Sequence, residues 1–131
     1  MTTKAQAVAT VASWDENAYD EQEGTPKTSK ASIKYAYDGD IVGESAAELL
    51  MVYVGEEAEY VGLERVTATI DGRKGTFVTS AVGGFKGGVA SSSWNVVPGS
   101  GTGDLEGLTG KGTFEAPSGN KGDVTFEYTI G

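Results

Sequence analysis

The chain has 131 residues, of which 38% are hydrophobic, and this suffices for one domain, 1–131, with a core of its own. Its formal net charge of −9 makes nucleic acids and anionic membrane surfaces poor partners, because both would repel the protein. The sequence contains no histidine and no cysteine, so catalysis by serine–histidine or cysteine–histidine pairs is excluded. Zinc, haem and iron–sulfur sites lose their usual ligands for the same reason, and we expect no metal and no cofactor.

The first predicted strand covers residues 3–13, where apolar and polar side chains alternate. No apolar run typical of a signal peptide occurs there, and the longest apolar stretch, 49–55, is too short to span a bilayer. We therefore expect a cytoplasmic protein. The polar segment 14–28 is predicted to be a long connection whose acids fit no EF-hand spacing. Its composition favours a solvated loop or a lid, held to the body by Trp14 and Tyr19.

Further strands follow this connection, most of them separated by short turns. Asp38-Gly39 and Asp71-Gly72 are hairpin signals, because both central residues of a type I′ turn need positive φ. The segment 45–53 is rich in good helix formers, but the hairpin turns that bracket it favour a strand. The expected strands are 29–38, 40–54, 57–70, 73–82, 89–97, 110–116 and 122–130.

A glycine-rich run, 99–107, invites comparison with nucleotide-binding loops. The spacing of Gly101, Gly103 and Gly107 misses the dinucleotide fingerprint by one residue, no βαβ unit surrounds it, and no Gly-Lys-Ser/Thr follows. A sharp corner in a β-barrel explains the run better. The acid and the glycine within 104–108 predict one short helical turn there.

The short connections predict the overall architecture. They imply that sequential strands are antiparallel neighbours, and the eight expected strands leave two unpaired edges unless the sheet closes on itself. We therefore predict an all-β protein, an antiparallel eight-stranded closed barrel. A two-sheet sandwich is the alternative, and periodicity does not choose between them.

Four motifs, in this order along the chain, carry a resemblance to a known family. They are Ser13-Trp14-Asp15-Glu16 with Tyr19-Asp20, Gly43-Glu44-Ser45 followed by Glu48-Leu49-Leu50-Met51, Gly62-Leu63-Glu64-Arg65-Val66, and residues 94–103. Together they resemble the bacterial domain-of-unknown-function family 3224 over essentially the whole chain. The resemblance implies an allene oxide cyclase-like, calycin-like barrel with 99–107 as its shared corner. It implies no function, because the family has none established.

Carboxylates are the main chemistry that the composition leaves. On the strand predicted for 57–70, Tyr60 and Glu64 share an otherwise apolar face, which should be the interior. An interior carboxylate has a raised pKa unless hydrogen-bond donors or a cation offset its burial. Glu48 on the preceding strand could come near Glu64, and the pair could act as general acid and base or bind a polar group. Alternatively, internal hydrogen bonds satisfy both, or both lie at a wet barrel mouth.

Aromatic residues form a second group of candidates. They could line a cavity and stack on an apolar ligand, although plain core or an oligomer interface is the more frequent use of such residues. Both faces of 49–54 are apolar, which predicts a homo-oligomer. The candidate cavity-lining residues are Glu48, Glu64, Tyr60, Tyr35 and Trp94.

These observations leave three hypotheses for function. The first is a barrel that binds a small, largely apolar ligand. The second is a cofactor-free isomerase or cyclase that acts through interior carboxylates, which rests on fold analogy alone. The third is a structural, homo-oligomeric module. The sequence does not decide whether the protein is an enzyme.

Overall fold

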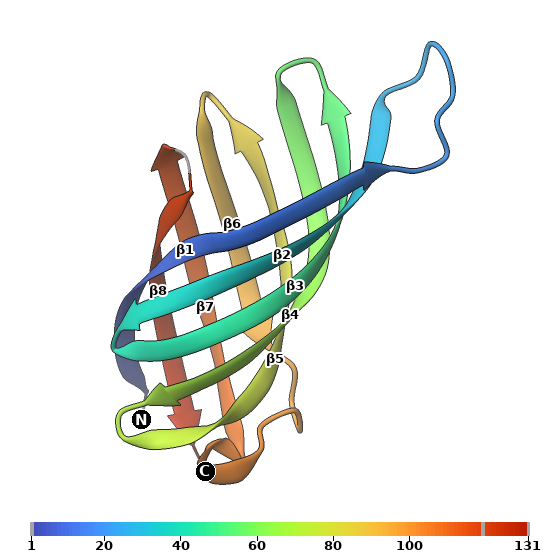
Figure 1. Ribbon diagram of the computed structural model, residues 1–131. Coiled ribbons are helices and arrows are strands. Elements are labelled where there is room, and N and C mark those ends of the chain that lie inside the picture. The colour runs from blue at the N-terminus through green and yellow to red at the C-terminus, as the bar shows by residue number, and fades with distance from the viewer. Residues whose placement is uncertain (1, 119, 131) are drawn as a thin grey trace.

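The computed structural model describes residues 2–118 and 120–130, which form a closed barrel of eight antiparallel strands joined in sequence order (Figure 1). This confirms the predicted all-β barrel and rules out the sandwich. The elements are β1 (Thr3–Ala18), β2 (Lys27–Gly39), β3 (Ile41–Val54), β4 (Glu57–Ile70), β5 (Arg73–Lys86), β6 (Val89–Val96), the 3₁₀ turn η1 (Gly103–Leu105), β7 (Leu108–Ser118) and β8 (Lys121–Ile130).

The helix-like segment 45–53 lies within β3 and has the burial pattern of a strand. Ser45, Ala47 and Leu49 are buried, whereas the residues between them are exposed. This period of two matches a sheet with one face in the core, so pairing with the neighbouring strands overrides the local helix propensity. Of the two predicted hairpin signals, Asp71-Gly72 has positive φ at both residues, whereas Gly39 alone has it in the other.

The connection predicted for 14–28 is shorter than expected. β1 continues to Ala18 and β2 begins at Lys27, so that the connection covers only 19–26. Polar residues of the two strands pair with each other, as Asp15 does with Ser32, in a ribbon that projects beyond the barrel wall (Figure 1). The alternation of apolar and polar residues in the sequence does not reveal such a ribbon, because little of the ribbon packs against the core. The connection is exposed along its length.

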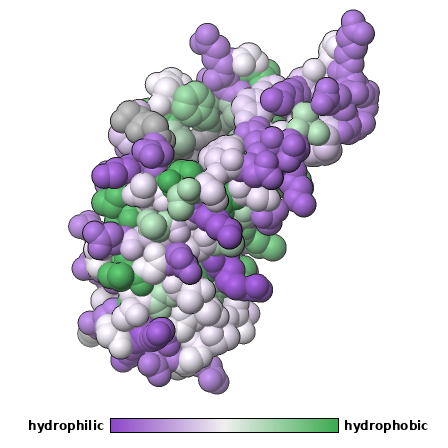
Figure 2. Space-filling model, in the orientation of Figure 1, coloured by the Kyte–Doolittle hydropathy of each residue, from purple (hydrophilic) through white to green (hydrophobic). Residues whose placement is uncertain are grey.

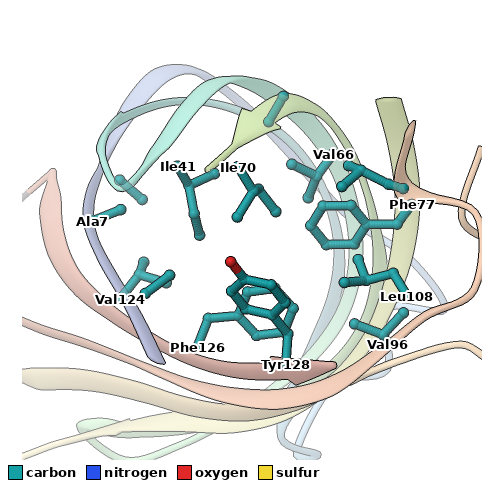
Figure 3. Close-up of a cluster of buried hydrophobic side chains, with 14 residues drawn as sticks. Ala7, Ile41, Val66, Ile70, Phe77, Val96, Leu108, Val124, Phe126 and Tyr128 are labelled. Carbon is teal, nitrogen blue, oxygen red and sulfur yellow. The ribbon is translucent and has the colours of Figure 1, made fainter. Parts of the chain in front are cut away.

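The end of the barrel that holds both termini is closed by a packed core (Figures 1 and 3). Figure 3 shows large side chains from several strands pointing toward one another there. Leu105 of η1 is 0% exposed and fills the end of the barrel. The predicted corner is tight, because a Cβ at Gly101 would stand 2.0 Å from the Leu105 carbonyl oxygen. The fully buried large residues include Ile41, Ile70, Phe77, Leu108 and Phe126.

The face of the molecule seen in Figure 2 is mostly polar, with smaller hydrophobic areas. An exposed apolar row crosses three neighbouring strands, because Leu50 of β3 pairs with Val61 of β4, which pairs with Val82 of β5. We expected a homo-oligomer because both faces of 49–54 are apolar, and this row shows that the outer face is indeed apolar there. The oligomer itself stays a prediction. Among the described residues, no helix is long and apolar enough to cross a membrane.

Candidate ligand cavity

The end of the barrel opposite the packed core opens into a cavity of about 300 Å³. Its rim includes Gly55, Glu56 and Asn120, which lie at or beside two of the hairpin turns. The wall below is apolar and largely aromatic. The aromatic residues that line it are Trp14, Tyr35, Tyr53, Tyr60, Phe85 and Phe114.

Deeper in the barrel lies a second, smaller chamber of about 30 Å³, which has room for a water molecule or a small polar group. It shares Tyr35, Leu49, Tyr60 and Phe114 with the wall of the cavity, so the chamber lies next to the cavity on the side of the core. Glu64 lies on its wall and carries the one carboxylate among its described lining residues. The other lining residues are Ala9, Tyr37, Ala47, Ala81, Ser92, Trp94 and Val124.

The Glu64 carboxylate is held by one of its two oxygens. Ser45 Oγ donates to Oε2 at 2.6 Å, and the Tyr37 hydroxyl donates to the same oxygen. Among the described residues no hydrogen bond to Oε1 is seen. The fully buried side-chain oxygens and nitrogens of these residues all have partners, so Oε1 is not fully buried. Oε1 is therefore the oxygen of this carboxylate that keeps some exposed surface.

The room around Glu64 comes from small side chains on the neighbouring strand. Ala47 of β3 pairs with Glu64 of β4, and Gly43 and Ser45 occupy the next two inward positions of β3. Of these residues, Ala47 lines the chamber, and a larger side chain there would fill it. Gly43 has φ of 159°, which is extended backbone, and a Cβ there would come within 2.2 Å of the Thr67 carbonyl oxygen.

The electrostatics of the chamber are those of a carboxylate with few charged neighbours. Burial raises the pKa of Glu64, although the hydrogen bonds from Ser45 and Tyr37 act to lower it. Burial also raises the pKa of Tyr37, and the nearby Glu64 charge adds to this effect. The Tyr35 hydroxyl has its pKa raised for the same two reasons. The phenols thus stay protonated at neutral pH.

Comparison with known proteins agrees with this architecture. A family model described as "Protein of unknown function (DUF3224)" matches residues 5–128. The chain belongs to the DUF3224 family. A solved structure of a protein of unknown function from the DUF3224 family of Shewanella oneidensis MR-1 is 22% identical to it, with a TM-score of 0.80 over 100% of this chain and 99% of the other. No curated protein matches the chain.

Membership in DUF3224 confirms the family resemblance of the sequence motifs, and the solved relative shares the fold. The finer likeness to allene oxide cyclase stays a prediction. Within the described part of this DUF3224 chain, no three acidic side chains gather closely enough to hold a metal ion.

The structure brings four of the five candidate residues of this DUF3224 protein together. Tyr35, Tyr60, Glu64 and Trp94 line the chamber, and the Trp94 ring also packs on Phe126, with 4.9 Å between ring centroids. A role for these residues in binding stays a prediction.

The expectation that Glu48 lies inside the barrel near Glu64 is wrong. Glu48 is on the outer face, where it accepts a hydrogen bond from Ser32 Oγ at 2.8 Å and lies 3.8 Å from Lys30 Nζ. The error arose because both faces of β3 are apolar near 49–54, so alternation does not identify the inner one. Pairing decides it, since Ala47 and not Glu48 stands beside Glu64.

A second polar group lies at the cavity wall and was not found from the sequence. Glu16 Oε1 accepts a hydrogen bond from Trp14 Nε1 at 3.0 Å, and Oε2 accepts one from Ser29 Oγ at 2.6 Å and one from the Tyr53 hydroxyl. Burial acts to raise the pKa of Glu16, but these bonds and the Lys27 charge lower it below its usual value. Glu16 thereby positions two aromatic side chains of the cavity wall.

Three residues outside the list of five candidates differ in how far the sequence could reveal them. Tyr37 belongs to the aromatic residues that the sequence offered as possible cavity lining, and it lies two residues after Tyr35, so the period of a strand places both on one face. Ser45 needs the register of β3, and Glu16 needs the extent of the projecting ribbon. Neither of the latter is a local property of the sequence.

Proposed function

We propose that this protein binds a small, largely apolar molecule in the barrel cavity, with one polar group of that molecule directed at Glu64. The observation that carries the proposal is a pair of adjoining hollows: an apolar cavity at the open end and, beside it, a chamber lined by Glu64, whose Oε1 has no hydrogen bond among the described residues. Such a hollow, with few polar groups at defined places, is the usual form of a ligand site.

The energetics of the walls support an occupant. Protein interiors pack closely, and side chains that line an empty space lose their contacts on that side. The hollow of about 300 Å³ opens at the end of the barrel, so water borders its apolar walls until a ligand displaces that water. A ligand gains roughly 25 cal/mol for each Å² of apolar surface removed from water.

Binding is favoured over the two alternatives for separate reasons. A purely structural module has no use for the hollow. The isomerase or cyclase hypothesis relied on acid–base catalysis by two interior carboxylates. Glu48 faces outward, so only the Glu64 carboxylate of that pair remains inside. The interior retains Glu64 with its donor Tyr37, which suits the recognition of a polar group.

A cavity-filling variant tests the proposal. Ala58 lines the cavity and is 4% exposed, so that Ala58→Phe places a ring inside it. We expect the wild type to bind the uncharged dye N-phenyl-1-naphthylamine with increased fluorescence, and Ala58→Phe to weaken binding by about tenfold or more. The matched control is Ala46→Phe, which makes the same change on the outer face of β3.

Circular dichroism spectra and melting curves establish that both variants fold. Native mass spectrometry of the freshly purified protein adds a second measurement, in which a co-purified small molecule would be released on denaturation. Equal dye affinity in the wild type and Ala58→Phe, with nothing released from the wild type, would refute the proposal.

A further inference from the structure

The acidic and basic side chains that line the cavity and the chamber are of one kind. Among the described lining residues, the acids are Glu56 at the rim and Glu64 in the chamber, and none is a lysine or an arginine. The whole chain carries a net charge of −9. An anionic ligand would therefore meet repulsion outside the barrel and an unpaired carboxylate within it.

The walls suit a cation. Tyr35, Tyr53, Tyr60 and Phe114 present aromatic rings, whose faces attract ammonium groups, and the attraction strengthens as water is excluded. The protein already shows one such contact, since Lys27 Nζ lies 5.2 Å from the centroid of the Tyr53 ring.

The chamber also offers an acceptor where an ammonium group would end. Ser45 and Tyr37 both donate to Glu64 Oε2, and no hydrogen bond to Glu64 Oε1 is seen among the described residues. The Tyr60 hydroxyl is already used, because it donates to the Ser91 carbonyl oxygen at 3.3 Å and also forms a side-chain hydrogen bond with Ser92. An ammonium group donates three hydrogen bonds and accepts none. It is therefore bound best by an acceptor that carries no proton of its own, such as a carboxylate oxygen.

We propose, on the basis of the function proposed above, that the cavity selects molecules in which a cationic amine is attached to an apolar or aromatic body, with the ammonium group at Glu64 Oε1 and the body against the aromatic walls. The amine is the polar end that the binding proposal left unspecified. Glu64 both pairs with the cation and excludes anions of the same shape.

Three probes that share one two-ring body test the proposal: 2-naphthylmethylamine, 2-naphthalenemethanol and 2-naphthoic acid. Isothermal titration calorimetry at pH 7 gives their dissociation constants. We expect the amine to bind the wild type at least about tenfold more tightly than the alcohol, and the acid to bind most weakly, because a charge-assisted hydrogen bond is worth more than a neutral one.

Glu64→Gln keeps the size and one acceptor but removes the charge. In this variant the ratio of amine to alcohol affinity should fall to about one. Glu48→Gln makes the same change on the outer face of β3 and should leave the ratio as in the wild type. Melting curves of both variants show that the comparison is between folded proteins.

The outcomes separate this inference from the function on which it rests. If the alcohol or the acid binds the wild type as tightly as the amine, or if the preference survives in Glu64→Gln, cation selection is refuted while ligand binding stands. If no probe binds and the Ala58→Phe experiment also shows no occupant, both proposals are refuted together.

Discussion

The two ends of the barrel are built by the same strands and yet have opposite interiors. At the end that holds the termini, Phe77, Leu105 and Phe126 are fully buried in one hydrophobic cluster. At the other end, aromatic side chains such as Tyr35 and Phe114 are only partly buried and surround a hollow. The closed sheet is common to both ends. The difference between a packed and a hollow interior therefore comes from the sizes of the inward side chains and from the η1 plug, that is, Leu105 at the end of the barrel.

β3 shows this division within a single strand. Its inward positions run from Ile41 at the packed end through the small residues Gly43, Ser45 and Ala47 to Leu49 at the cavity. The packed end can stabilise the barrel while the open end keeps room for a ligand. This separation predicts that substitutions at the two ends differ in their effect on stability.

The largest effect is expected from removing a ring in the packed core. Phe126→Ala should lower the free energy of unfolding by about 3–5 kcal/mol, because it leaves a void among residues that cannot move in to fill it. Phe114→Ala makes the same change at the cavity wall, which already borders open space, and should cost less than half as much. Urea unfolding followed by tryptophan fluorescence measures both. Equal losses would mean that the two ends are packed alike.

Glycine substitutions should show the same contrast with smaller effects. Gly101→Ala would force a Cβ to within 2.0 Å of the Leu105 carbonyl oxygen, so the plug must shift, at a cost of about 2–3 kcal/mol. Gly55→Ala, in a turn at the open end, meets nothing within 4 Å and bears only the cost of its φ of 63°, about 1 kcal/mol. Thermal unfolding ranks the two variants. A greater loss in Gly55→Ala would contradict the tight corner.

The smallest effects are expected in the pH dependence of stability, where the two carboxylates of the open end should differ in sign. Burial raises the pKa of Glu64 in the folded state above its ordinary value of 4.5, so the folded protein holds that proton more tightly. Its contribution to stability is greatest at acid pH and is lost as pH rises from about 4.5 through the raised pKa. Glu64→Gln should remove this loss.

Glu16 should show the opposite behaviour. Although burial acts to raise its pKa, the hydrogen bonds from Ser29 and Tyr53 lower it in the folded state. Its contribution is therefore present above its ordinary value of 4.5 and is lost as pH falls through the lowered pKa. Urea unfolding of the wild type, Glu16→Gln and Glu64→Gln between pH 4 and 8 separates the two contributions. If both variants change the pH profile in the same direction, one assignment is wrong.

Local patterns predicted most of the fold. Alternation and turn residues predicted the strands, and the glycine run with Asp104 predicted the corner that the structure shows around η1. These features depend on side-chain direction and backbone freedom within a few residues. The projecting ribbon was not predicted, because β1 and β2 pair there through polar residues such as Asp15 and Ser32 that have no core to mark them.

The sequence by itself determined the antiparallel all-β strands, the absence of histidine and cysteine chemistry, and the inward face of β4 with Tyr60 and Glu64. The tertiary structure decided that these strands close into a barrel and do not form a sandwich. Only the tertiary structure decided the inward face of β3, which moved Glu48 to the surface and placed Ser45 at Glu64. The physical reason is register. A shift of one residue in strand pairing exchanges the two faces of a strand, and where both faces are apolar only the neighbouring strand can select one.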